Sequence, residues 1–284
     1  MIGEWLNAPV VDTSSHSFTF IKITNKKQAD SPIIEYLQKN ILYTYEDKES
    51  LDFSLADGTR DSIRAYLKAL FPNDDNSDNE KSKIRIQAGD LAEVSTKLIL
   101  KHFYNKDSLN KLKYKFHSGK SVFGTDLITF DNIKDPHDIS FYEVKSKKNL
   151  SPKKEKLPNG DDAEIYISVV AHDSLKYDTE QVVNPVLRFM MQKSFESKEF
   201  DQAKLFREII HKKRVLNQKY GIFIMTEDSE TKIPSLITAL ESVKNRLTPL
   251  SMTIVLVDDL TYIRNEVWNG IEKYAFDLYG VGDD

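Results

Sequence analysis

Three charged side chains of this 284-residue chain have the types and spacing of a site that acts on phosphate: Asp126, Glu143 and Lys145. Side chains alternate between the two faces of a strand, so Glu143 and Lys145 share one face of the strand expected at 139–145. Asp126 lies at the start of the preceding expected strand, 125–130. In an antiparallel hairpin the start of one strand lies beside the end of the next. The pattern therefore predicts that the three side chains meet.

Two carboxylates a few ångströms apart repel each other, which favours a shared proton or a cation between them. Magnesium fits such a pair, because it takes one or two carboxylates together with waters and substrate phosphate oxygens, and Mn²⁺ is the expected substitute. The metal would polarise the phosphate and lower the pKa of a bound water. Lys145 would orient that water or stabilise charge on the phosphorane oxygens. The other interpretation is an exposed ion pair that contributes little free energy.

Glu93 lies on the helix expected at 86–104, before these strands, and has two interpretations. The spacing of Asp90 and Glu93 matches a capping box, in which Glu93 would bond back to a backbone amide at the start of the helix. The functional interpretation makes Glu93 a third ligand of the metal or of its water. The sequence leaves both interpretations open.

The distribution of charge favours contact with nucleic acid at one segment only. The net charge of -4 and the pI near 5.9 argue against a protein that coats nucleic acid unaided. Residues 97–156 carry 14 lysines, no arginine and 7 acids, so this segment is +7 and the remainder is -11. The lysines expected to contact the DNA backbone are Lys120, Lys147, Lys148, Lys153 and Lys154. Such lysine runs are also typical of solvated turns.

Hydrophobic periodicity predicts an α/β protein with a mixed sheet. Strands are expected at 18–23, 112–117, 125–130, 139–145, 220–226 and 252–257, and helices at 32–42, 60–71, 86–104, 236–246 and 260–278. A lysine-rich turn is expected at 147–156, and a mostly helical stretch at 162–213 with breaks near Tyr177 and Pro185. Asp259 is the expected cap of the last helix. Strands that alternate with helices in the second half predict parallel pairing there.

Size and composition set the remaining bounds. The polar, acidic run 72–80 divides the chain into an N-terminal α+β extension, 1–80, and a nuclease-like domain, 81–284. No run approaches the roughly 18 apolar residues that span a bilayer, and the first residues lack the pattern of a secretory signal, so we expect a cytoplasmic protein that binds no membrane. The chain has no cysteine, so any metal must be held by oxygen or imidazole.

An acid on a helix, then Gly-Thr-Asp126, then Glu143-Val-Lys145 resembles the PD-(D/E)XK nuclease superfamily, with threonine in place of the proline. The resemblance implies a restriction-endonuclease-like αβββαβ core, to which the expected elements of residues 86 to 226 are similar. More narrowly, residues 89–93 (Gly-Asp-Leu-Ala-Glu), the Gly-Thr-Asp and the Glu-Val-Lys-Ser sequences resemble the HamA family, the nuclease subunit of the Hachiman anti-phage system. That resemblance implies a helicase partner, HamB, which holds the nuclease inactive until abnormal DNA is sensed.

The leading hypothesis is a Mg²⁺-dependent deoxyribonuclease with little sequence specificity that acts in phage defence. Its metal ligands would be Asp126, Glu143 and Glu93, and Lys145 would complete the catalytic set. One alternative is a catalytically silent subunit that uses a nuclease fold to bind and regulate a partner, for which the acidic remainder of the chain is suited. Another keeps the enzyme but makes it a Holliday-junction resolvase or a restriction-type nuclease.

Overall fold

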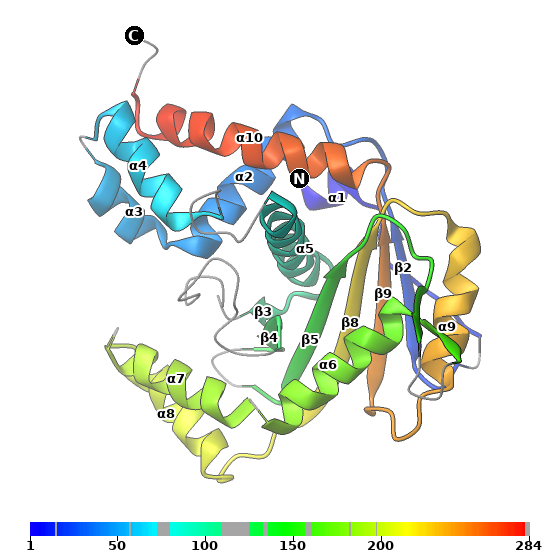
Figure 1. Ribbon diagram of the computed structural model, residues 1–284. Coiled ribbons are helices and arrows are strands. Elements are labelled where there is room, and N and C mark those ends of the chain that lie inside the picture. The colour runs from blue at the N-terminus through cyan, green and yellow to red at the C-terminus, as the bar shows by residue number, and fades with distance from the viewer. Residues whose placement is uncertain are drawn as a thin grey trace.

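The computed structural model describes residues 1–281 except 15, 57, 73–79, 109–124, 133–135, 157–160, 182 and 197. Within that part of the chain a seven-stranded mixed sheet has the order β1-β2-β9-β8-β5-β4-β3, and helices cover both of its faces (Figure 1). The predicted α/β class is confirmed. The predicted strand at 112–117 and Lys120 lie outside the described residues.

The strands are β1 (Val10–Val11), β2 (Thr19–Thr24), β3 (Asp107–Ser108), β4 (Leu127–Phe130), β5 (Asp138–Ser146), β6 (Lys153–Lys156), β7 (Asp162–Ile165), β8 (Asn217–Thr226) and β9 (Leu250–Leu256). The helices are α1 (Ile2–Trp5), α2 (Ser31–Tyr45), α3 (Lys48–Leu55), α4 (Arg60–Leu70), α5 (Glu80–Tyr104), α6 (Ile167–Gln181), α7 (Val183–Glu196), α8 (Phe200–Ile210), α9 (Ile233–Glu241) and α10 (Leu260–Leu278).

The pairing of the strands follows the two predictions made for it. β4 and β5 pair antiparallel, with Leu127 opposite Tyr142, as expected of the hairpin that precedes the Glu-Val-Lys sequence. β5, β8, β9 and β2 run parallel, each beside the next. Parallel strands covered on both faces read as continuous apolar runs, which is why β8 and β9 are buried over most of their length. The four parallel strands therefore bring their carboxyl ends to one edge of the sheet.

Alternation along the strands divides the core in two. Tyr142 and Val144 of β5 face the core that includes α2, α5 and α10. Phe141 of the same strand faces the core that includes α6, α8 and α9. Because Glu143 and Lys145 have the same parity as Phe141, their side chains leave β5 on the α6 side.

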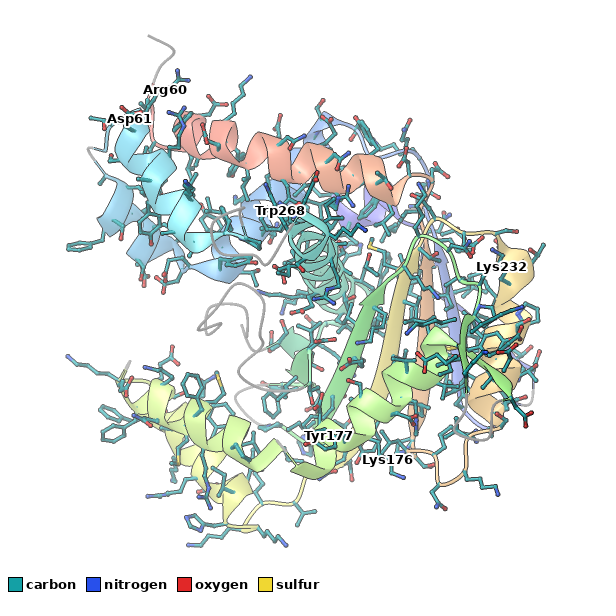
Figure 2. The ribbon with its side chains drawn as sticks, in the orientation of Figure 1. Arg60, Asp61, Lys176, Tyr177, Lys232 and Trp268 are labelled. Atoms are coloured by element: carbon teal, nitrogen blue, oxygen red, sulfur yellow. The ribbon has the colours of Figure 1, made fainter. Side chains whose placement is uncertain are left out.

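Three expectations about helices and turns are wrong. α5 begins at Glu80, so Asp90 and Glu93 lie inside it and the capping box does not form. The break expected near Tyr177 falls within α6, which continues to Gln181, and the Tyr177 side chain points outward from the helix (Figure 2). Residues 147–156 include strand β6, which pairs antiparallel with β7 and places Lys154 opposite Glu164 and Lys156 opposite Asp162. Helix 260–278 and its Asp259 cap are confirmed, since Asp259 Oδ1 accepts the Tyr262 N–H at 2.7 Å.

The first 80 residues contact the rest of the chain through both a strand and helices. β2 pairs with β9 inside the large sheet, and Gln38 of α2 donates to the Glu266 carbonyl of α10 at 3.1 Å. Trp268 of α10 lies where α10, α2 and α5 meet, and its indole N–H donates to the Gln87 carbonyl at 3.1 Å (Figure 2). The boundary at residue 80 stays a prediction.

None of the helices in the described ranges is long and apolar enough to pass through a bilayer. The cytoplasmic location stays a prediction.

Candidate active site

The carboxyl end of β5 holds a buried ion pair. Glu143 is 3% exposed, and Lys145, two residues further on the same face, is 28% exposed at its side chain. Lys145 Nζ lies 2.5 Å from Glu143 Oε1. The other carboxylate oxygen, Oε2, is buried and has no hydrogen-bond partner in the described part of the chain. A buried acceptor without a donor is costly, so this oxygen marks a place where a cation or a donor would be stabilised.

Asp126 is fixed beside that pair by the neighbouring strand. It immediately precedes β4, whose first residue, Leu127, lies opposite Tyr142. The backbone N–H of Val144 donates to Asp126 Oδ2 at 2.7 Å, so the carboxylate bridges the start of β4 to the end of β5. The structure thus brings Asp126 next to the Glu143 and Lys145 strand, where the hairpin argument placed it.

The electrostatics of the pair depart strongly from those of exposed groups. Burial, and then the charge of Asp126, raise the pKa of Glu143 to about 7, although Lys145 and Ser174 of α6 act to lower it. Burial acts to lower the pKa of Lys145, but the charges of Glu143 and Asp126 and the hydrogen bond to Glu143 outweigh it, so its pKa is raised. Lys145 therefore stays protonated at neutral pH while Glu143 is poised between its two states. Ionisable groups perturbed in this way are typical of functional sites.

Glu93 lies close enough for its charge to act on the same lysine. It is half-buried on α5, which packs against β5, and its charge contributes to the raised pKa of Lys145. Its charge also acts on Tyr45 of α2, whose hydroxyl is buried and donates to Asp90, one turn before Glu93. Burial, then Asp90, hold the pKa of Tyr45 well above its usual value. With the capping interpretation overturned, the ligand interpretation of Glu93 remains as a prediction.

The Tyr45–Asp90 pair was missed in the sequence, and no local signal marks it. Its two residues lie 45 positions apart, on helices that meet only in the folded chain. Asp90 is 1% exposed, which is rare for an aspartate unless it is paired. The pair fixes the orientation of α5 one turn from Glu93.

A hard divalent cation fits the chemistry of these groups. Their donors are carboxylate oxygens, which magnesium prefers, and the buried Oε2 of Glu143 is a donor with no protein partner in the described ranges. Among the residues that the structure describes, no three or more histidine, cysteine, aspartate or glutamate side chains gather closely enough to hold a metal ion. Metal binding by Asp126, Glu143 and Glu93 together therefore stays a prediction.

Two of the lysines proposed to contact DNA lie directly after β5. Lys147 Nζ donates to the Ser151 carbonyl at 2.8 Å, and burial, then the neighbouring charge of Lys232, lower its pKa. Lys148 is 71% exposed at its side chain and pairs with Glu227 at 2.7 Å. Lys147 is thus partly used in holding its own loop, whereas Lys148 reaches solvent at the carboxyl edge of the sheet.

The other two described lysines lie on the small β6–β7 sheet. Lys153 pairs with Glu155 at 2.6 Å, and both are exposed. Lys154 is exposed on the same strand. Lys120 lies outside the described residues, and contact of any of these side chains with DNA stays a prediction.

Two acids at the end of β8 were also missed in the sequence. Glu227 Oε2 accepts the backbone N–H of Leu260 at 2.8 Å and of Thr261 at 3.3 Å, so it stabilises the positive end of α10. Glu227 also pairs with Lys148, which lies three residues after Lys145. An acid directly after a buried parallel strand is the signal that marks Glu227, since that edge is where functional loops converge.

The second acid, Asp228, holds the loop after β5 from the other side. Its Oδ2 accepts the Leu150 N–H at 2.5 Å and the Lys232 ammonium at 2.9 Å. Lys232, which lies beside this loop at the start of α9, also donates to Asn149 Oδ1 at 2.8 Å (Figure 2). The two acids together fix the lysine-bearing loop to the sheet edge.

Comparison with known proteins identifies one relation. The family model described as HamA matches residues 2–281. No curated protein matches the chain.

Proposed function

The chain belongs to the HamA family, that of the Hachiman defence protein, and from this premise we propose that it is a metal-dependent DNA nuclease. It would cleave phosphodiester bonds with little sequence specificity, as the effector of a Hachiman anti-phage complex. A helicase subunit similar to HamB would control it. The family match supports the defence role, and the site on β5 supports the chemistry.

The single observation that carries the nuclease proposal is the buried group at the end of β5. A carboxylate that is 3% exposed lies 2.5 Å from a protonated lysine, and a second carboxylate is held across the hairpin by the Val144 N–H. A structural ion pair alone would not need the Asp126 charge, which raises the pKa of Glu143 and so opposes its ionisation. Concentrating negative charge at a place with an unpaired buried oxygen is useful when a cation binds there.

Each residue of the group has a distinct part in the proposed reaction. Asp126 and Glu143 would hold Mg²⁺, or Mn²⁺ in its place, with Glu93 as a third carboxylate. When bound, the metal supplies charge neutralisation at the scissile phosphate and a more acidic water. Lys145, kept protonated by its neighbours, would donate hydrogen bonds to the attacking water or to the developing charge on the phosphate oxygens. The lysines after β5 would contact the backbone of the DNA without reading its sequence.

Plasmid nicking in Mg²⁺ tests this proposal. Glu143→Gln and Lys145→Ala are each expected to lower the cleavage rate by about 100-fold or more, the usual effect of removing a charged group that acts in the transition state. The matched control is Lys219→Ala, because Lys219 pairs with Asp138 at the opposite, exposed end of β5. Calorimetric titration of Mn²⁺ into the same proteins gives a second readout, and binding should be lost in Glu143→Gln but kept in Lys219→Ala.

Two results would overturn the nuclease assignment. One is cleavage by Glu143→Gln and Lys145→Ala at the rate of the parent, and the other is cleavage undiminished by a chelator. If the isolated chain does not cut, Mn²⁺ binding that is equal in parent and Glu143→Gln counts against the site. Mapping products on linear, branched and supercoiled DNA separates a defence nuclease from a junction resolvase or a restriction-type enzyme.

One alternative function has an observation in its favour. The described residues contain no cluster of three metal-binding side chains, and the chain outside 97–156 is strongly acidic, which suits a subunit that binds protein. A phage challenge of cells that carry the complete system separates the two. Protection that survives Glu143→Gln and Lys145→Ala would favour the silent interaction subunit, and its loss with normal protein levels would favour the nuclease.

A further inference from the structure

The α7–α8 hairpin projects from the sheet as a separate arm (Figure 1). Its inner side is anchored by Leu187 and Phe206, which belong to the core on the α6 face. Its outer side exposes Phe195, at 63%, and Phe200, at 58%, whose rings stack edge to face with centroids 5.4 Å apart. The hairpin therefore already has the apolar contacts that fold it, and these two aromatic rings are additional.

The exposed rings belong to a groove of about 790 Å³ between the two helices. On α7 the lining positions include Met191 and Phe195, and on α8 they include Phe200, Ala203 and Ile210. On each helix these positions recur every three, four or seven residues, which is the spacing of one helix face. Two antiparallel helices with such facing stripes form the surface on which a third helix packs in a bundle.

The charges that line the groove are all positive in the described part of the chain. They are Arg188, Lys204 and Arg207. The nearest acid on α7, Glu196, is held by Lys193 at 2.6 Å and by Gln192 at 2.8 Å. The hairpin as a whole, residues 183–214, has eight lysines and arginines against four acids, although the full chain is -4. The groove is thus apolar at its floor and cationic at its rim.

We propose that this groove binds an amphipathic helix of a partner protein, with an apolar stripe flanked by aspartate and glutamate. The apolar side chains of the helix would cover Phe195 and Phe200, and each large apolar side chain buried in this way contributes about 1.5–3 kcal/mol. Its acids would face Arg188, Lys204 and Arg207, which selects the partner and its orientation. This is the helix-in-groove mode of recognition. The proposal does not depend on the nuclease proposal, because no residue of the groove belongs to the β5 site.

A protein helix accounts for the groove better than a nucleic acid strand does. Bases stack on aromatic faces along a basic channel, whereas here the two rings meet edge to face and the groove is also lined by the apolar side chains of Met191 and Ile210. The heptad-like spacing on both helices has a function for a helix and none for an extended strand.

Selection from a display library of helical peptides tests the proposal with the full chain as target. The peptides enriched on the parent are expected to carry apolar residues at helical spacing with acidic flanks. Fluorescence anisotropy of a selected peptide should show at least about 10-fold weaker binding to Phe195→Ser and to Arg207→Glu, since 1.4 kcal/mol is tenfold in affinity. Phe53→Ser on α3 is the matched control, because Phe53 is 91% exposed and far from the groove in sequence. A version of the peptide with its acids changed to lysine should regain binding to Arg207→Glu.

The outcomes that would overturn the proposal are distinct. One is selection on Phe195→Ser that enriches the same peptides as selection on the parent, and another is selected peptides with basic flanks. A third is binding of a fluorescent single-stranded oligonucleotide to the parent that is lost in Phe195→Ser and Arg207→Glu. Concentration-dependent sedimentation of the parent that is abolished by Phe195→Ser would assign the groove to a second copy of the chain instead. Plasmid nicking by Phe195→Ser is expected to equal that of the parent, so failure of this proposal and failure of the nuclease proposal are separable.

Discussion

Replacing Glu143 by glutamine should change the pH dependence of folding as well as activity. Glutamine keeps the size of the side chain and a carbonyl acceptor for Lys145, but it cannot ionise. The pKa of Glu143 is raised from 4.5 to about 7, mainly by burial and then by Asp126. In metal-free buffer the side chain of Glu143 therefore ionises more easily in the unfolded parent than in the folded parent. Glutamine cannot ionise, so the variant lacks this difference between the two states.

The size of the effect follows from proton linkage. A folded-state pKa above the unfolded one gives stability that is complete below pH 4.5 and is lost as the pH rises through about 7. At about 1.4 kcal/mol for each pKa unit, the full shift corresponds to about 3 kcal/mol, of which about 2–3 kcal/mol is lost between pH 5 and pH 8. Relative to Glu143→Gln, the parent should lose this much free energy of unfolding across that interval. For a chain of this size it corresponds to a difference of about 3–5 °C in Tm.

Urea titrations of the parent and Glu143→Gln at pH 5 and pH 8, in chelator, measure this difference. The variant leaves Lys145 without its carboxylate, which adds an offset at both pH values but leaves the slope unchanged while Lys145 stays protonated. Glu196→Gln is the control. Hydrogen bonds from Lys193 and then from Gln192 lower the pKa of Glu196, so this carboxylate is ionised in the folded and in the unfolded chain from pH 5 to pH 8. The free energy of unfolding of Glu196→Gln should therefore change with pH as that of the parent does. If the free energy of unfolding of Glu143→Gln also changed with pH as that of the parent does, Glu143 would not be a carboxylate buried beside a second charge.

Further predictions concern the elements that support the site. Tyr45→Phe removes a donor from the buried Asp90 carboxylate and should lower the free energy of unfolding by about 1–3 kcal/mol, so an unchanged urea midpoint would contradict the role given to this pair. Gly221→Ala on β8 would place a Cβ 2.3 Å from the ring of Tyr142 and should cost about 1–3 kcal/mol, measured as a lower Tm. In Gly89→Ala of α5 the added Cβ meets nothing within 4 Å, so this variant should instead stabilise the fold by about 0.5–1 kcal/mol. An equal fall of Tm in both glycine variants would show that the close approach of Tyr142 to Gly221 does not cause the loss of stability.

The parts of the fold that local pattern decides were predictable. β5 follows from alternation, because the face that begins with the apolar Ile139 and Phe141 turns charged at Glu143 and Lys145. Parallel pairing followed from the order of strands and helices, and the antiparallel hairpin before it placed Asp126 beside β5. Asp259 as the cap of α10 followed from the position of a short acid before an apolar periodic stretch.

The wrong prediction of a capping box has a physical cause, which is that an acid has the same local appearance in two settings. Asp90 and Glu93 have the spacing of a capping box, and an aspartate before an apolar stripe usually does begin a helix. Here α5 begins ten residues earlier, and the Tyr45 hydroxyl supplies Asp90 with the donor that a helix start would have supplied. Only the packing of α2 on α5 provides that donor, and sequence spacing cannot reveal it.

The site was easier to predict than its surroundings because its residues lie close together in the sequence. Glu143, Lys145 and Asp126 meet through one hairpin, whose register is fixed by alternation within a short stretch of chain. The loop that follows is instead held by Glu227 and Asp228, which arrive with β8 after three intervening helices. Glu227 contacts both the positive end of α10 and Lys148 of this loop. The chemistry of the site is therefore local in sequence, whereas the position of the lysines beside it depends on the assembly of the whole parallel sheet.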